Sequence, residues 1–131
     1  LAAKKATPIF VEAITDMTFR DAMNILLGEK DAATRYLETE TRTALYTAFL
    51  PVIQSALDEV NARTYWSSVV NAYNNVPFVK KVNPKLDDHV NQKALDGLFS
   101  LIEVKESKIR GDQSERKTDL LKKVFAQQDK D

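Results

Sequence analysis

The sequence contains no cysteine, which excludes a disulfide framework, a thiolate nucleophile and a cysteine metal site. This absence is compatible with every cellular compartment, the cytoplasm included. Neither sign of charge is in excess, because Lys plus Arg and Asp plus Glu each number 19. A formal net charge of zero argues against non-specific electrostatic binding to nucleic acid or to anionic lipid. No apolar run approaches the length of a transmembrane segment.

Glycine and proline are also scarce, with three and four residues respectively. Ala, Leu, Lys, Glu and Asp are abundant instead, a composition typical of an all-α protein. Hydrophobic residues make up 44%, an ordinary share for a protein with a core. A chain of 131 residues fits one domain, so we expect residues 1–131 to form a single helical domain.

The stretch around which we expect this domain to be organised runs from residue 86 to residue 109. Its apolar residues recur at steps of one, three and four along the chain: Leu86, Val90, Ala94, Leu95, Leu98, Phe99, Leu101 and Ile102. This spacing predicts a helix whose apolar arc is wider than a surface helix needs. We therefore predict six or seven helices packed in a bundle-like domain around a central, buried helix 86–109.

The boundaries of this helix are marked by polar residues, proline and glycine. Asn83-Pro84 resembles an N-cap followed by proline at the first helical position, and Gly111 resembles a stop. Gly97 lies in the interior, where it costs about 1 kcal/mol of helix propensity relative to alanine. Two interpretations remain open: another helix approaches closely at Gly97, or the cost is simply tolerated.

Before this stretch, the sequence predicts helices near 8–16, 18–28 and 31–42, the second opened by a capping box of Thr18 and Asp21. We expect Thr7-Pro8 to begin the first and Asp31 to cap the third. An apolar stripe from 45 to 60 crosses Pro51, where a kink is predicted.

Asn61 is a plausible left-handed stop for that stripe. A helix then follows over 65–74, and an extended segment over 76–82. One last short helix is expected over 120–125.

Few residues suggest catalysis. His89 is the only histidine, and its neighbours Asp87 and Asp88 point about 100° apart on a helix, so the three cannot converge on one ion. A solvated or capping role is therefore favoured for His89. The carboxylates Glu38, Glu40, Asp58 and Glu59 are best interpreted as a solvated helix surface. We expect no enzyme activity, no metal site and no cofactor.

Two groups of side chains are candidates for binding. Tyr65, Trp66, Tyr73 and Phe78 could line a pocket for an apolar ligand or a partner helix, although their spacing favours core packing. Lys80, Lys81 and Lys85 could contact nucleic acid or an anionic headgroup, although the zero net charge favours a solvated loop.

Several ordered motifs resemble a bacterial family known as domain of unknown function 4197. They lie at 8–11 (PIFV), 31–34 (DAAT), 77–84 (PFVKKVNP), 93–99 (KALDGLF) and 118–125 (TDLLKKVF), and so span nearly the whole chain. The resemblance implies a helical protein of the periplasm or envelope, with a leader and further helices preceding the part printed here. It supplies no activity, substrate or catalytic residue.

The function that we expect is a non-enzymatic binding or scaffolding module of the bacterial envelope. Its partner would be another protein or an apolar small molecule, and not nucleic acid. The candidate binding residues are Phe78, Lys80, Lys81, Lys85, Trp66 and Tyr73. Two alternatives stay open: a small-molecule or lipid carrier with a cavity between helices 65–73 and 86–109, and an enzyme of unknown reaction.

Overall fold

The computed structural model describes residues 2–112, and side chains from Lys4 onward. Within this range the chain forms five helices and no strand, which confirms the all-α prediction. The helices are α1 (Ala2–Thr15), α2 (Phe19–Leu26), α3 (Ala32–Asp58), α4 (Ala62–Asn74) and α5 (Leu86–Gly111). The predicted helix 31–42 and the predicted stripe 45–60 form one helix, α3, so residues 2–112 contain five helices, whereas six or seven were predicted for the whole chain. The helix predicted over 120–125 lies outside the described residues.

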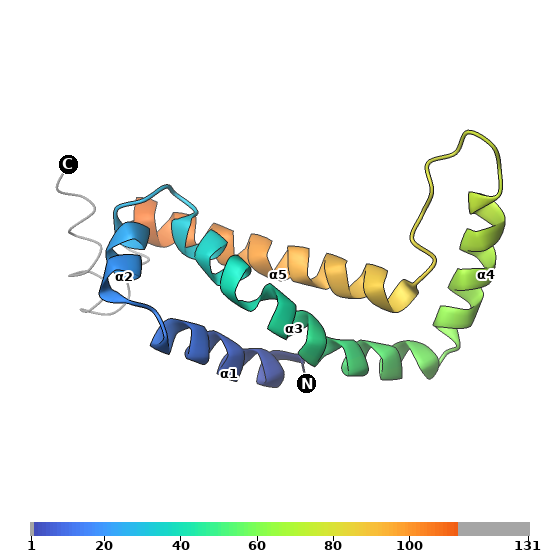
Figure 1. Ribbon diagram of the computed structural model, residues 1–131, viewed down its shortest axis with the longest axis horizontal. Helices are drawn as coiled ribbons and strands as arrows, with labels where there is room; N and C mark the ends of the chain where they lie inside the picture. The colour runs from blue at the N-terminus through green and yellow to red at the C-terminus, as the bar shows by residue number, and fades with distance from the viewer. Residues whose placement is uncertain (1, 113–131) are drawn as a thin grey trace.

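The helix at the centre of the fold is α3, and not the predicted helix 86–109. Helix α3 packs against α5 on one side and α1 on the other, and it also contacts α2 and α4. Figure 1 shows α1, α3 and α5 running lengthwise, with α2 at one end and α4 at the other. The prediction of a central helix 86–109 is therefore wrong, although the segment does form a single helix.

Helix α5 is buried along one face only. Leu95 and Phe99 are 0% and 1% exposed, whereas Leu101 and Val104 are 71% and 53% exposed. The wide apolar arc that suggested burial on several sides therefore includes positions that face solvent. A Cβ added at Gly97 would meet no heavy atom within 4 Å, so the interpretation of a close helix approach there is also wrong.

The core lies where α1, α3 and α5 meet. Leu45 and Phe49 of α3 pack with Leu95 and Phe99 of α5 and with Ala6 of α1. The ring of Phe10 meets that of Phe99 edge to face, with 6.3 Å between centroids. The partly buried residues around this cluster are Ile9, Phe10, Leu37, Tyr46, Ala48, Ile53, Leu98 and Ile102. One continuous apolar seam thus joins the three long helices.

Local sequence signals set several boundaries correctly. The Thr18 side chain accepts a hydrogen bond from the Asp21 amide at 3.0 Å, and the Asp21 side chain accepts one from the Thr18 amide at 3.2 Å. This is the predicted capping box. Asn61 has the left-handed conformation predicted for it, with φ of 55°. Residues 65–74 are helical as predicted, within α4, and loop 75–85 contains no helix.

Two predicted helix starts are wrong. Pro8 lies inside α1 and does not begin it, because Ala6 before it is buried in the core and Ile9 and Phe10 after it pack against the same core. Helix α5 begins at Leu86 and not at Pro84. The Asn83 side chain forms a turn before the helix, accepting from the Lys85 amide at 3.0 Å and donating to Asp88 at 2.7 Å.

The third helix start is capped by a residue distant in sequence. Asp31 occupies the N-cap position of α3, but its side chain makes no capping hydrogen bond. The buried carboxylate of Glu106 instead accepts from the amides of Ala33 at 2.9 Å and Thr34 at 2.8 Å. Arg110 donates to Glu106 at 2.8 Å and to the Leu26 carbonyl at 3.0 Å. One end of α5 thereby fixes the start of α3 and the end of α2.

The hydrogen bonds around Glu106 also determine its ionisation. Burial raises the pKa of Glu106, but the hydrogen bonds from Thr34, Ala33 and Arg110 together outweigh burial and hold this pKa below its ordinary value of 4.5. Glu106 is therefore an internal anion that the fold keeps charged.

Candidate interaction surface

Helix α4 and loop 75–85 form a projection that we call the arm. The left-handed residue Asn61 ends the run of α3, and α4 then rises across the direction of the long helices (Figure 1). Val70 is the only residue of α4 that is buried. Loop 75–85 returns from the top of α4 to the start of α5. Much of the arm is therefore surface.

The base of the arm is fixed by charged hydrogen bonds. Arg63 of α4 donates to Asp58 at 2.7 Å and to Asp87 at 3.4 Å. The Asp87 carboxylate also accepts from Gln54 at 2.8 Å. The hydrogen bond from Gln54 lowers the pKa of Asp87, and the hydrogen bond from Arg63 lowers the pKa of Asp58. Arg63 is therefore engaged within the fold.

A second connection joins α5 to α3 beside this base. The Tyr46 hydroxyl donates to Asp88, and this hydrogen bond raises the pKa of Tyr46 to about 12 and lowers that of Asp88. The two acids next to His89 thus hold helices together. His89 itself stacks on the ring of Trp66, with 5.6 Å between centroids. Within residues 2–112 no three acidic or histidine side chains gather as metal ligands do.

The stem of loop 75–85 is held by side chains of α4. The Asn74 amide donates to the Val82 carbonyl at 2.7 Å and accepts from the Val82 amide at 2.8 Å. The Trp66 indole donates to the Asn83 carbonyl at 2.9 Å. Sequence reasoning missed Asn74, whose only signal was an amide side chain at a helix end. These bonds fix where the loop stands relative to α4.

The tip of the loop presents an aromatic ring to solvent. Phe78 is 106% exposed, so nothing in the described chain covers it. Its φ is 67°, in the left-handed region that costs a non-glycine residue about 1–2 kcal/mol. Lys80, Lys81 and Lys85 follow on the same loop and are all exposed. The three lysines are exposed, as both interpretations of them require, whereas core packing is wrong for Phe78.

An apolar stripe continues from the tip down the outer face of α4. Tyr65, Val69 and Tyr73 lie four residues apart, on one face of the helix. They are 68%, 67% and 46% exposed, and Val76 beyond them is 50% exposed. Core packing is therefore wrong for Tyr65 and Tyr73 and holds only in part for Trp66, which is half-buried. The structure brings Trp66, Tyr73, Phe78 and the three lysines onto one arm.

The charge of the arm differs from that of the whole chain. No Asp or Glu occurs from Val60 to Leu86, a stretch that contains Arg63, Lys80, Lys81 and Lys85. Since Arg63 is paired, the lysines supply the available charge. Within residues 2–112 none of these three lysines has an ion pair. The zero net charge of the sequence concealed this local excess.

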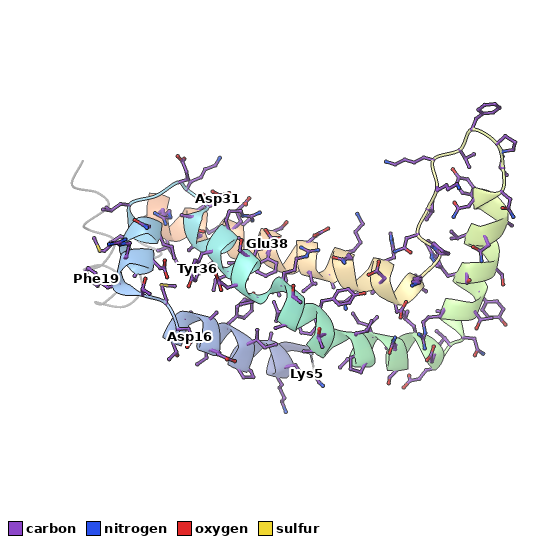
Figure 2. All side chains as sticks on the ribbon, in the orientation of Figure 1. Lys5, Asp16, Phe19, Asp31, Tyr36 and Glu38 are labelled. Atoms are coloured by element: carbon purple, nitrogen blue, oxygen red, sulfur yellow. The ribbon has the colours of Figure 1, made fainter. Side chains whose placement is uncertain are left out.

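Two hollows lie at the other end of the molecule. One has a volume of about 260 Å³ and is lined mainly by apolar side chains, namely Ile14, Met17, Ala22, Ile25, Leu26, Ala33, Tyr36 and Leu37, with Arg110. The other, of about 370 Å³, is bordered by the acids Glu12, Asp16, Asp21 and Glu40. Figure 2 shows Asp16 and Tyr36 near this end, far from the arm. Neither hollow adjoins the candidate binding residues.

The remaining predicted acids lie on the surface of the helices. Glu38 pairs with Arg35 at 2.9 Å and with Arg42 at 3.2 Å, while Glu40 and Glu59 are exposed. Asp58 pairs with Arg63, as described above. This distribution agrees with a solvated helix surface.

The whole chain was also compared with known proteins and protein families. No helix among the described residues combines the length and the hydropathy that crossing a bilayer requires. No curated protein and no solved structure matches the chain. The family model described as "Protein of unknown function (DUF4197)" matches residues 1–126, which is nearly the whole chain. This agrees with the resemblance of its sequence motifs, and the chain belongs to the DUF4197 family.

Proposed function

We propose that this protein is a non-enzymatic binding or scaffolding module of the bacterial envelope, and that the arm is its contact surface. The observation that carries the proposal is the exposure of Phe78 on a stem that the fold itself holds in place. Exposed aromatic side chains on a rigid support are typical of binding surfaces. The left-handed φ of Phe78 supports the same conclusion, because strained residues cluster at functional positions.

The carrier alternative has less support. The apolar hollow of about 260 Å³ is smaller than the roughly 300–1,000 Å³ typical of ligand pockets. It also lies between α1, α2, α3 and α5, and not between α4 and α5, where the sequence placed it. The enzyme alternative would need acids or His89 gathered in a cleft, and the acids nearest His89 already bind Gln54, Arg63, Tyr46 and Asn83.

A sedimentation experiment with native bacterial envelope fragments tests the proposal. The wild-type chain should sediment with the fragments, and the variant with Phe78→Ala, Lys80→Ala and Lys81→Ala should stay in solution. A matched control changes an exposed Phe and two exposed lysines elsewhere: Phe19→Ala, Lys4→Ala and Lys5→Ala. Figure 2 shows Phe19 on α2 and Lys5 on α1, both away from the arm. Equal sedimentation of wild type and the arm variant would refute the proposal.

A further inference from the structure

The chemistry of the arm suggests what kind of surface it meets. The loop combines an uncovered aromatic ring with three exposed lysines, and it contains no acid. A complementary partner must therefore accept an apolar side chain and carry negative charge. Because the ring and the lysines lie on one short loop, the apolar and the negatively charged parts of the partner must lie close together.

The shape of the arm helps to decide between a folded protein and a bilayer as its partner. Among the described residues, Phe78 is 106% exposed and the next most exposed large apolar residue, Phe19, is 81% exposed. It stands on the segment that connects the far end of α4 to α5 (Figure 1). A folded protein partner would need a hollow shaped to such a protruding tip. The interface of a bilayer is deformable and receives a protruding aromatic side chain without a preformed hollow.

The stripe on α4 has the composition of a helix that meets an interface. Tyr65 and Tyr73 carry a ring with a polar end, the type of side chain that gathers at the boundary between headgroups and acyl chains. Val69 lies between the two tyrosines, and Val76 extends the apolar surface from Tyr73 toward the tip. The lysines after the tip can meet phosphate groups, because long cationic side chains reach toward the headgroup layer.

We propose that loop 75–85 docks on the surface of an anionic phospholipid bilayer. In this docking, Phe78 enters the interface, Lys80, Lys81 and Lys85 lie against lipid phosphates, and the Tyr65–Tyr73 face of α4 rests at headgroup level. The inference rests on the proposed function, since it names the partner of the arm. It gives a chain of zero net charge a local means of binding a negative surface.

Vesicles of defined composition test this inference. The full chain is mixed with vesicles of phosphatidylglycerol and phosphatidylethanolamine, or of phosphatidylcholine alone, and separated by flotation. We expect binding to the anionic vesicles and at least about tenfold weaker binding to phosphatidylcholine. Lys80→Glu with Lys81→Glu should weaken binding by more than about tenfold, and Phe78→Ala by about tenfold. Raising the salt concentration should also weaken the binding of the wild-type chain, because salt screens the lysine charges.

Matched controls separate the arm from general surface effects. Lys4→Glu with Lys5→Glu makes the same change of charge on α1, and Phe19→Ala removes an exposed ring from α2. Both should bind like wild type. The inference is refuted if anionic vesicles do not bind the chain, or if the control variants lose as much binding as the arm variants. Circular dichroism of each variant establishes that it remains folded.

A spectroscopic readout reports on the arm directly. Trp66 is the only tryptophan, and its indole binds the Asn83 carbonyl at the loop stem. Its emission should shift to shorter wavelength with anionic vesicles and stay constant with Lys80→Glu and Lys81→Glu. If native envelope fragments bind through the arm but vesicles do not, the lipid inference fails and the proposed function stands. If neither binds through the arm, both fail.

Discussion

Two phenylalanines illustrate how the body of the molecule differs from its arm. Phe99 of α5 is 1% exposed and packs in the core, whereas Phe78 of the arm is 106% exposed. The body packs its core with apolar side chains and pairs the buried charge of Glu106 with Thr34 and Arg110, although Phe19 and Leu101 of the body are exposed. The arm is tied down by polar bonds at its base and stem, and its apolar stripe and Phe78 are exposed. The difference agrees with the proposal that the arm is the contact surface and the body its support.

The difference between body and arm is tested most directly by making the same substitution in both regions. Phe99→Ala should lower the free energy of unfolding by about 4 kcal/mol, because it leaves a cavity in the core. Phe78→Ala should change it by less than about 0.5 kcal/mol, because no contact within the chain is lost. Urea denaturation followed by circular dichroism measures both. Similar losses in the two variants would show that Phe78 is part of a packed structure.

A second test concerns the internal anion. Glu106→Gln should lower the free energy of unfolding at neutral pH by about 3 kcal/mol, because Arg110 and the amides at the start of α3 lose their charged partner. Urea denaturation measures the loss. Glu103→Gln serves as a control, because Glu103 is exposed and pairs with Arg35 at the surface.

The same carboxylate makes stability depend on pH. Its pKa is lower in the folded chain than the ordinary 4.5, so its contribution is complete above about pH 4.5 and is lost as pH falls through the folded value. Between about pH 6 and pH 3 the wild-type chain should therefore lose stability more steeply than Glu106→Gln. Parallel slopes for the two proteins would contradict the lowered pKa.

A third test concerns backbone strain in the arm. Phe78 has a φ of 67°, which glycine adopts freely and alanine does not. Phe78→Gly should therefore be more stable than Phe78→Ala, by about 1 kcal/mol, in contrast to the usual order in which alanine is favoured. The comparison uses thermal and urea denaturation of the two variants. A less stable glycine variant would mean that the left-handed conformation is not maintained in solution.

The smallest effect is expected at a glycine of the body. Gly97 lies inside α5 with open space around its missing Cβ, so Gly97→Ala should raise the free energy of unfolding by about 0.8 kcal/mol. Gly28 gives the contrast, because a Cβ there would lie 2.6 Å from the Asn24 carbonyl oxygen. Gly28→Ala should therefore be destabilising. Thermal denaturation distinguishes the two, and a loss of stability in Gly97→Ala would imply that a neighbour packs there.

Local patterns predicted much of the fold. The capping box of Thr18 and Asp21, the left-handed Asn61 and the single helix after residue 86 all follow from interactions within a few residues. The loop with Phe78 and the lysines was also selected from the sequence, as irregular backbone between two prolines. What failed were inferences about burial. Tyr65, Tyr73 and Leu101 have helical spacing that fits a core, but spacing does not say whether a partner covers them.

The sequence by itself determined that the chain is helical, where most helices end and which family it belongs to, because these depend on composition, neighbouring residues and ordered motifs. Only the tertiary structure decided that α3 is the central helix, that Glu106 caps it from more than seventy residues away and that Asn74 holds the loop stem. The contacts of α3 and of Glu106 join segments distant in sequence, and the Asn74 bonds depend on how loop 75–85 folds back onto α4. An amphipathic pattern predicts that a helix has an apolar face. Whether another helix covers that face depends on the tertiary packing.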